Sequence, residues 1–98
     1  MYTILRTKEF DRWLTKLRDA KGKARILARI KSVELGNLGD AKSVGSGVNE
    51  LRVHYGPGYR VYFKKKGNVL IVLLIGGDKS SQSRDIEKAK VLAERLKE

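Results

Sequence analysis

Two stretches of alternating apolar and polar residues meet at Gly56-Pro57-Gly58, and this pattern constrains the fold more than any other feature of the chain. Apolar side chains occupy every second position from Leu51 to Tyr55 and again from Tyr59 to Phe63. A period of two is typical of a β-strand with one buried face, and glycine and proline between two such runs are typical of a turn. The pattern therefore predicts a β-hairpin.

The same period places six polar side chains on the other face of this hairpin. They are Glu50, Arg52 and His54 in the first strand and Arg60, Tyr62 and Lys64 in the second. If the two registers agree, all six share one surface. We assign Tyr55 and Tyr59, which alternate with them, to the core.

The N-terminal third predicts a short strand followed by a helical hairpin. Residues 2–6 are rich in β-forming side chains, and Thr7 is suited to cap the helix that follows. The apolar face of this first helix comprises Phe10, Trp13, Leu14 and Leu17. A second amphipathic helix is expected to bury Ile26, Leu27, Ile30 and Val33. We expect Trp13 to lie buried against the sheet.

The second half of the chain predicts a connector, an interior strand and a last helix. Residues 36–47 contain four glycines, which favours a loop. The run Val69–Ile75 is apolar at every position, which predicts a central strand that pairs antiparallel with Tyr59–Lys64. We expect the chain to open into a loop at Gly76-Gly77. The apolar face of the final helix comprises Ile86, Ala89, Leu92 or Ala93, and Leu96.

Composition limits the classes of protein and partner. The 98 residues suit a single domain, residues 1–98, and the net charge of +11, from 22 Lys+Arg and 11 Asp+Glu, favours a polyanionic partner. There is no cysteine, and no apolar run reaches the roughly 20 residues of a membrane-spanning helix. The N-terminal residues lack the pattern of a secretory signal, so we expect a cytoplasmic protein with no membrane partner.

His54 is the single histidine of the chain, and histidine is the residue type whose unperturbed pKa, about 6.5, lies near neutrality. It is therefore the candidate for proton transfer, with a plain surface histidine as the alternative. RNA can be cleaved without a metal if cations also stabilise the charge on the phosphate. Arg52, Arg60 and Lys79 are candidates for these cations. An ion pair with Glu50 is the alternative role for Arg60.

Four further side chains are candidates for holding RNA. Tyr62 can stack on an unpaired base, or it can be half-buried packing. Lys64 lies on the same predicted strand face. Ser80 and Ser81 follow Gly76-Gly77, where the backbone can approach a phosphate closely, although a simple turn explains the glycines nearly as well. Scattered carboxylates and one histidine give no recognised ligand spacing, so we expect neither a metal nor a cofactor.

Four motifs follow one another along the chain: Gly47–Arg52, Gly58–Phe63, Gly76–Gln82 and Asp85–Ala89, with the apolar strand before the third. In this order they resemble the toxins of the RelE/ParE superfamily, and most closely its HigB-type "addiction module killer", or phage Gp49-like, branch. The resemblance covers essentially the whole chain. It implies an α+β, RelE-like fold with an N-terminal strand and helical hairpin packed on a small, mostly antiparallel sheet, and a C-terminal helix.

The resemblance also implies a function. We expect the toxin of a type II toxin–antitoxin system, a ribosome-dependent endoribonuclease that cuts mRNA in the A site by metal-independent phosphodiester cleavage and so inhibits translation. The expected partners are the ribosome with its mRNA and a cognate antitoxin that contains a helix-turn-helix part. We expect operator DNA to be contacted only through this antitoxin. The alternatives are a ParE-like inhibitor of DNA gyrase, which shares the fold, and a non-catalytic RNA-binding module.

The resemblance carries over to single residues. Arg52 and His54 take the places of two alternating lysines of RelE, if one residue is deleted in the following turn, and Arg60 matches the arginine that follows Gly-Tyr there. Lys79 falls near another RelE arginine. The C-terminal tyrosine of RelE has no counterpart, because residues 85–86 occupy that neighbourhood, and the C-terminal histidine of HigB is missing too. His54 is therefore our assignment for proton transfer.

Overall fold

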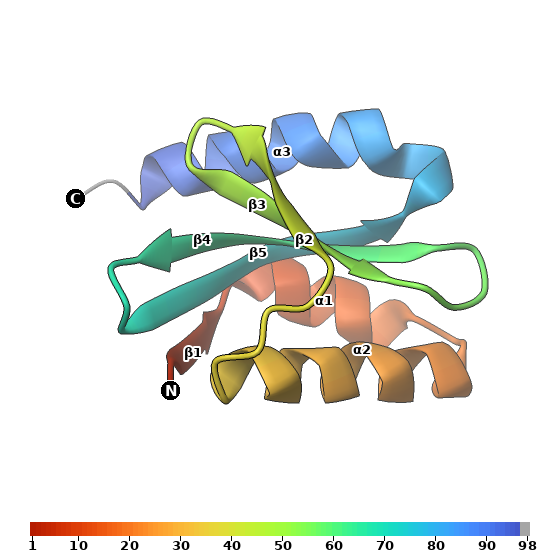
Figure 1. Cartoon of the computed structure of the whole chain (residues 1–98). Coiled ribbons are helices and arrows are strands. Elements are labelled where there is room, and N and C mark those ends of the chain that lie inside the picture. The colour runs from red at the N-terminus through yellow and green to blue at the C-terminus, as the bar shows by residue number, and fades with distance from the viewer. Residues whose placement is uncertain (97–98) are drawn as a thin grey trace.

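The computed structural model describes residues 1–96 and has an α+β fold (Figure 1). The elements are β1 (Thr3–Arg6), α1 (Lys8–Lys16), α2 (Ala20–Glu34), β2 (Ala41–Gly45), β3 (Val48–Val53), β4 (Tyr59–Lys66), β5 (Leu70–Asp78), the 3-10 turn η1 (Lys79–Ser81) and α3 (Gln82–Arg95). The five strands form one sheet in the order β1-β5-β4-β3-β2. Of the strand pairs in residues 1–96, β1–β5 is parallel and the other three are antiparallel, as the predicted fold class requires.

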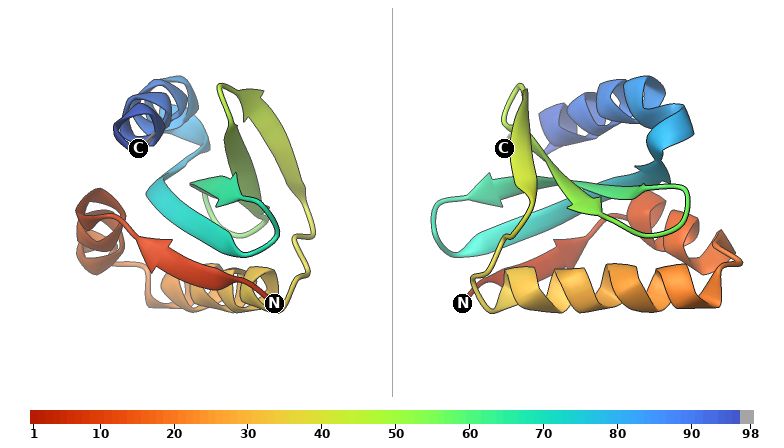
Figure 2. Two further views of the ribbon diagram at one scale, coloured as in Figure 1. Left: turned by 90° about the vertical axis from the view of Figure 1, so that its left-hand side faces the viewer. Right: turned by 45° about the vertical axis from the view of Figure 1, so that its right-hand side comes forward.

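Helices cover both faces of the sheet, with α1 and α2 on one side and α3 on the other (Figures 1 and 2). The core on the α1–α2 side includes Phe10, Leu14, Ile26, Ile30, Val33, Leu51, Val53, Val61, Phe63, Ile71 and Leu73. The core on the α3 side includes Val48, Tyr62, Val72, Leu74, Ile75, Ala89, Leu92 and Ala93. Both faces of β4 and β5 are therefore buried, which explains the continuous apolar run in β5.

The N-terminal strand and helical hairpin are confirmed, with two differences in burial. Thr7 caps α1, because its Oγ1 accepts a hydrogen bond from the Phe10 backbone N–H at 2.9 Å. Trp13 is partly rather than fully buried, and its ring lies over Gly76 near the end of β5, where an added Cβ would lie 2.3 Å from the ring. Leu27 was expected in the core but is 40% exposed, since it lies at the margin of the apolar face of α2.

Two segments that were expected to be loops belong to strands. Residues 41–45 form β2, which pairs with β3 through a turn in which Ser46 and Gly47 have φ angles of 56° and 77°. The glycines at 76 and 77 continue β5 to Asp78. The Trp13 ring and the Asp85 carboxylate occupy the space where their side chains would lie, so glycine is required there for packing and not for a turn.

The remaining predictions of secondary structure are confirmed. β3 and β4 form the predicted hairpin, and β5 lies between β1 and β4 and pairs antiparallel with β4. The strand begins at Leu70, and Val69 is exposed in the preceding turn. Within residues 1–96 no helix is both long enough and apolar enough to cross a membrane.

Candidate functional site

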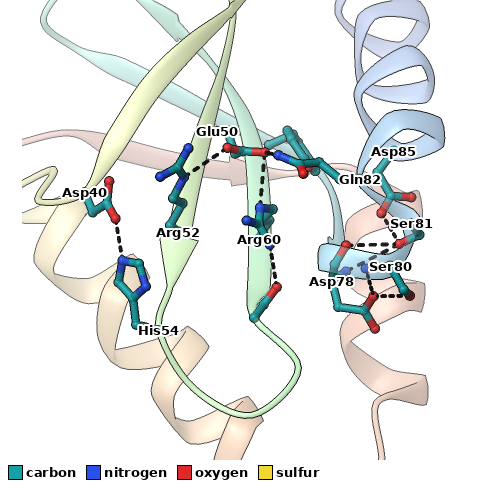
Figure 3. A network of polar contacts seen from close by, with 12 residues as sticks. Asp40, Glu50, Arg52, His54, Arg60, Asp78, Ser80, Ser81, Gln82 and Asp85 are labelled. Atoms are coloured by element: carbon teal, nitrogen blue, oxygen red, sulfur yellow. Dashed lines mark hydrogen bonds and ion pairs between the residues drawn. The ribbon is translucent and has the colours of Figure 1, made fainter.

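A fully buried carboxylate, that of Glu50, organises the polar face of the β3–β4 hairpin (Figure 3). Its partners come from both strands and from the first turn of α3. The Tyr62 hydroxyl donates to it at 3.0 Å, the Gln82 side-chain amide donates at 2.8 Å, and Nε of Arg52 and of Arg60 lie 3.3 and 3.4 Å away. The strand register produces this cluster, because Glu50 pairs with Tyr62 and Arg52 with Arg60.

These contacts keep the buried carboxylate ionised. Burial alone raises the pKa of Glu50, but the hydrogen bonds from Gln82, Tyr62 and Arg52 and the charge of Arg60 outweigh burial, and the net pKa lies below the ordinary glutamate value. Burial, together with the hydrogen bond that Tyr62 donates to Glu50, raises the pKa of the Tyr62 hydroxyl. At neutral pH the network therefore holds one negative charge between two guanidinium groups and a neutral phenol.

Arg60 combines an internal ion pair with an outward-facing group. Only 13% of its side chain is exposed, and its Nη1 donates to the Gly58 carbonyl at 2.9 Å. The ion pair with Glu50 that the sequence offered as an alternative is present, and it uses Nε. Within residues 1–96 the buried Nε has this ion pair but no hydrogen bond, and Nη2 has neither. The contact with Glu50 therefore fixes the guanidinium and leaves donor capacity for a ligand.

A shallow depression of about 520 Å³ lies beside the turn between β3 and β4. His54, Arg60 and Lys79 all line it, and its remaining wall is Tyr55 and the turn Gly56-Pro57-Gly58. Arg52 lies next to it, in a second depression of about 330 Å³ that shares His54. The structure thus brings all four cationic or titrating side chains that the sequence singled out to one end of the hairpin.

His54 follows the last residue of β3 and is held by a carboxylate from another segment. Its side chain is 74% exposed, and its Nε2 is hydrogen-bonded to Oδ2 of Asp40 (Figure 3). That bond lowers the pKa of the Asp40 carboxyl, and the charges of Arg52 and Arg29 act in the same direction. An imidazole that donates from Nε2 to Asp40 presents Nδ1 as an acceptor. Nδ1 has no partner among residues 1–96, so it is free to contact a ligand.

The sequence model of the family described as "Phage derived protein Gp49-like (DUF891)" matches residues 12–98. The chain belongs to this Gp49-like family. A protein of Haemophilus influenzae (strain ATCC 51907 / DSM 11121 / KW20 / Rd), described as an uncharacterized protein, is 54% identical over 93 residues, which cover 95% of this chain and 94% of the relative. The Gp49-like family is a toxin family of the RelE/ParE type, for which a cognate antitoxin is the expected partner.

Four predicted RNA-binding residues of this Gp49-like protein lie in less suitable positions. Tyr62 is fully buried beneath α3, which favours the packing alternative over base stacking. Lys64 pairs with Val48, and three residues of β4 separate it from Arg60. Its Nζ instead contacts the Ala93 carbonyl of α3 at 3.4 Å. The Ser80 hydroxyl donates to Asp78 and the Ser81 hydroxyl donates to Asp85, and Ser81 completes the capping box of η1 with Asp78.

Sequence reasoning missed three residues of the Gp49-like site. Asp40 holds His54 but lies in a glycine-rich segment that carries no strand signal. Arg29 of α2 fixes that segment by donating to the Leu38 carbonyl at 3.0 Å. Gln82 was noted only as part of a motif, and its contact with Glu50 depends on how α3 docks. No local pattern reports such contacts, since each joins distant segments. No group of three or more His, Cys, Asp or Glu side chains in residues 1–96 is arranged to hold a metal ion.

Proposed function

We propose that this Gp49-like protein is a HigB-type toxin of a type II toxin–antitoxin system that cuts mRNA on the ribosome without a metal ion. The observation that carries the proposal is the depression in which His54, Arg60 and Lys79 meet. A titrating group and two cations around one open hollow are the groups that metal-free cleavage of RNA needs. The polyanionic partner predicted by the net charge of +11 is then RNA.

In this proposal Nδ1 of His54 removes the proton from the ribose 2′-hydroxyl, and the 2′-oxygen attacks the phosphorus. The bond from phosphorus to the 5′-oxygen breaks, and that oxygen takes up a proton from solvent water. The products are a 2′,3′-cyclic phosphate and a 5′-hydroxyl end. Asp40 holds the imidazole in one orientation. Nη2 of Arg60 donates to a phosphate oxygen as negative charge develops, and the Lys79 ammonium adds a second cation.

The excess of basic residues suits the binding of an antitoxin of opposite charge. A helix-turn-helix antitoxin encoded beside the toxin gene would cover or distort the surface formed by Arg52, His54 and Arg60, and operator DNA would be contacted through the antitoxin alone. Opposite charges speed such an association, so its rate constant should fall as salt rises. Stopped-flow mixing of the two proteins at several salt concentrations measures this rate.

The test is to map mRNA ends after a short induction of the toxin, and again with purified ribosomes programmed with one mRNA. We expect cuts in phase with codons that leave 5′-hydroxyl ends. His54→Ala should slow cleavage by about 10²–10⁴-fold and leave binding to the ribosome largely unchanged. Lys66→Ala is the control, since this exposed lysine lies at the other end of β4.

The alternatives give different results in the same experiment. Loss of DNA supercoiling without cut mRNA would identify a ParE-like gyrase inhibitor, and bound but intact mRNA would identify a non-catalytic RNA-binding module. If the His54→Ala variant cuts as fast as the wild type, proton transfer belongs to Lys79 or to the RNA of the ribosome. Tyr62 is a poor substitute because it is buried and its pKa is raised.

A further inference from the structure

A second depression, of about 330 Å³, adjoins the candidate site between α2 and the end of β3. Val53 and Ala28 contribute apolar surface to its lining, and Arg25, Tyr55 and Arg52 contribute the groups discussed below. His54 and Tyr55 line both this depression and the one at the turn, so the two hollows lie next to each other. A chain that places one phosphate beside Arg60 and His54 would carry its neighbouring nucleotide into this second hollow.

The hollow contains a cation–π pair of two planar groups. The Arg25 guanidinium lies over the Tyr55 ring, with its central carbon 4.7 Å from the ring centroid. Arg25 is exposed and Tyr55 is partly buried, so the guanidinium covers the ring toward solvent. Guanidinium planes and aromatic rings are the surfaces on which unpaired bases stack in complexes with single-stranded RNA. The pair thus forms a ready platform for one base.

The charge around the platform suits a nucleotide better than an uncharged ligand. Arg25, Arg29 and Arg52 line the hollow, against one carboxylate, Asp40, which is hydrogen-bonded to His54. Arg29 donates to the carbonyls of residues 38, 40 and 52, so its charge is fixed in place. A planar apolar platform inside a cationic rim matches a base attached to a sugar phosphate.

We propose that this hollow is a nucleotide subsite of single-stranded RNA, in which the base next to the scissile phosphate stacks on the Arg25–Tyr55 pair. The inference rests on the proposed function, because that function places the scissile phosphate beside Arg60. A volume of about 330 Å³ lies at the lower end of the range for ligand sites and is of the right order for one nucleotide. Because every base has a π-face, the stack fixes the position of the RNA more than its sequence.

The test uses a short RNA in which every ribose is 2′-O-methylated, so that it binds but cannot be cut. One base is 2-aminopurine, whose fluorescence falls when it stacks, and each position is substituted in turn at low salt. For the wild-type chain we expect quenching at one position. Tyr55→Leu should remove the quenching and weaken binding by about 5- to 100-fold, and Arg25→Gln should act likewise but more weakly.

A second cation–ring pair in the protein provides the matched control. The Lys65 ammonium lies 5.7 Å from the Tyr2 ring centroid, and both residues lie outside the two hollows. Tyr2→Leu and Lys65→Gln therefore make the same chemical changes elsewhere, and they should leave the quenching in place. Arg25→Gln keeps the test decisive if Tyr55→Leu fails to fold, since Arg25 is exposed.

The outcomes separate this inference from the proposed function. If no position is quenched in the wild type, or if the Tyr55 and Arg25 variants bind this RNA as the controls do, the subsite is refuted even where mRNA is still cut on the ribosome. If quenching depends on Tyr55 and Arg25 but no mRNA is cut, the subsite stands and the nuclease proposal fails. A Tyr55→Leu variant that loses binding to antitoxin or gyrase but not to RNA would overturn the subsite.

Discussion

The two ends of the β3–β4 hairpin are both basic, yet their cations are held in different ways. At the turn end, Arg52 and Arg60 flank the buried Glu50 carboxylate, and His54 is tied to Asp40. At the opposite end, which we call the lysine end, β4 finishes with three consecutive lysines at positions 64–66. Two of these three are exposed, and the third contacts a helix carbonyl.

The comparison separates two uses of positive charge. Exposed lysines attract a polyanion over a distance, and salt screens the attraction. A guanidinium that is already fixed by a carboxylate needs no reorganisation when charge develops on a phosphate, and this preorganisation makes an electrostatic contact catalytic. Net charge therefore predicts the class of partner, and the fixed charges at the turn end indicate where we place the proposed chemistry.

The largest effect is expected when the carboxylate that fixes the turn end is removed. Glu50→Ala leaves Arg60 and the Tyr62 hydroxyl buried without their partner, and should lower the free energy of unfolding by about 3–5 kcal/mol. Urea unfolding followed by circular dichroism measures the change. Glu87→Ala, an exposed glutamate of α3 beside the lysine end, should stay within about 0.5 kcal/mol of the wild type. If the two variants lower the free energy of unfolding equally, the turn end is not held more firmly than the lysine end.

The next effect concerns the geometry of Arg60 at constant charge. Arg60→Lys keeps the cation but loses the planar fork, and should reduce cleavage of ribosome-bound mRNA by about 10²–10³-fold with the protein still folded. Arg60→Ala is less informative, because the side chain is mostly buried and its loss also deprives Glu50 of a partner. Arg12→Lys, at an exposed position of α1, serves as control and should cleave normally. Full activity of Arg60→Lys would show that fixed geometry is unimportant.

A smaller effect is expected for the exposed cation of the turn end. Lys79→Ala should slow the proposed cleavage by about tenfold, because an exposed ammonium is screened by water but lines the depression proposed to hold the phosphate. Lys66→Ala removes the same charge from the lysine end and should change the rate less than twofold at physiological salt. Cleavage rates at two salt concentrations test both variants. Equal losses would mean that net charge alone matters.

The smallest effect is one of pH. The pKa of Glu50 is lower in the folded protein than its ordinary value of 4.5, so this carboxyl contributes stability that is fully present above pH 4.5 and is lost as the pH falls through the lowered pKa. Urea midpoints measured from pH 7 to pH 3 should therefore decline at the acid end. In Glu50→Gln this part of the decline should be missing, while the parts due to Asp19 and Asp40, whose pKa values are also lowered, should remain. Parallel curves for the two proteins would contradict the assignment.

The sequence predicted the elements that depend on local periodicity and missed the features that depend on docking. Alternation was enough for the hairpin, and a continuous apolar run was enough for β5. The same alternation placed Glu50 and Tyr62 on a polar surface, but it carries no information about α3, which covers that part of the face. β2 was missed because its pairing with β3 includes a register shift between Ser43 and Gly45 that interrupts any regular pattern.

The candidate site shows the same limit. Arg52, His54, Arg60 and Lys79 were chosen from residue type and resemblance, and the structure brings them to one end of the hairpin. Lys64 lies near the other end of β4 from Arg60, and a shared strand face does not specify which end of the strand a side chain occupies. Asp40 and Gln82 come from segments 14 and 32 residues away from their partners, and only tertiary packing brings them into contact.

The parallel pairing of β1 with β5 sets the order in which the protein can assemble during its synthesis. In the described chain β1 pairs with residues 70–73, and the Thr7 hydroxyl donates to the Leu74 carbonyl. The pairing of β1 therefore cannot form until β5 has been made. The contact of Glu50 with the side-chain amide of Gln82 forms later still, because Gln82 follows β5 in the chain. Contacts between such distant segments form late, because the entropy of closing the intervening loop must first be overcome. A nascent chain that already contains Arg52 and Arg60 still lacks Gln82, which helps to fix Glu50 between them, so the candidate site is complete only after the last third of the chain has been made.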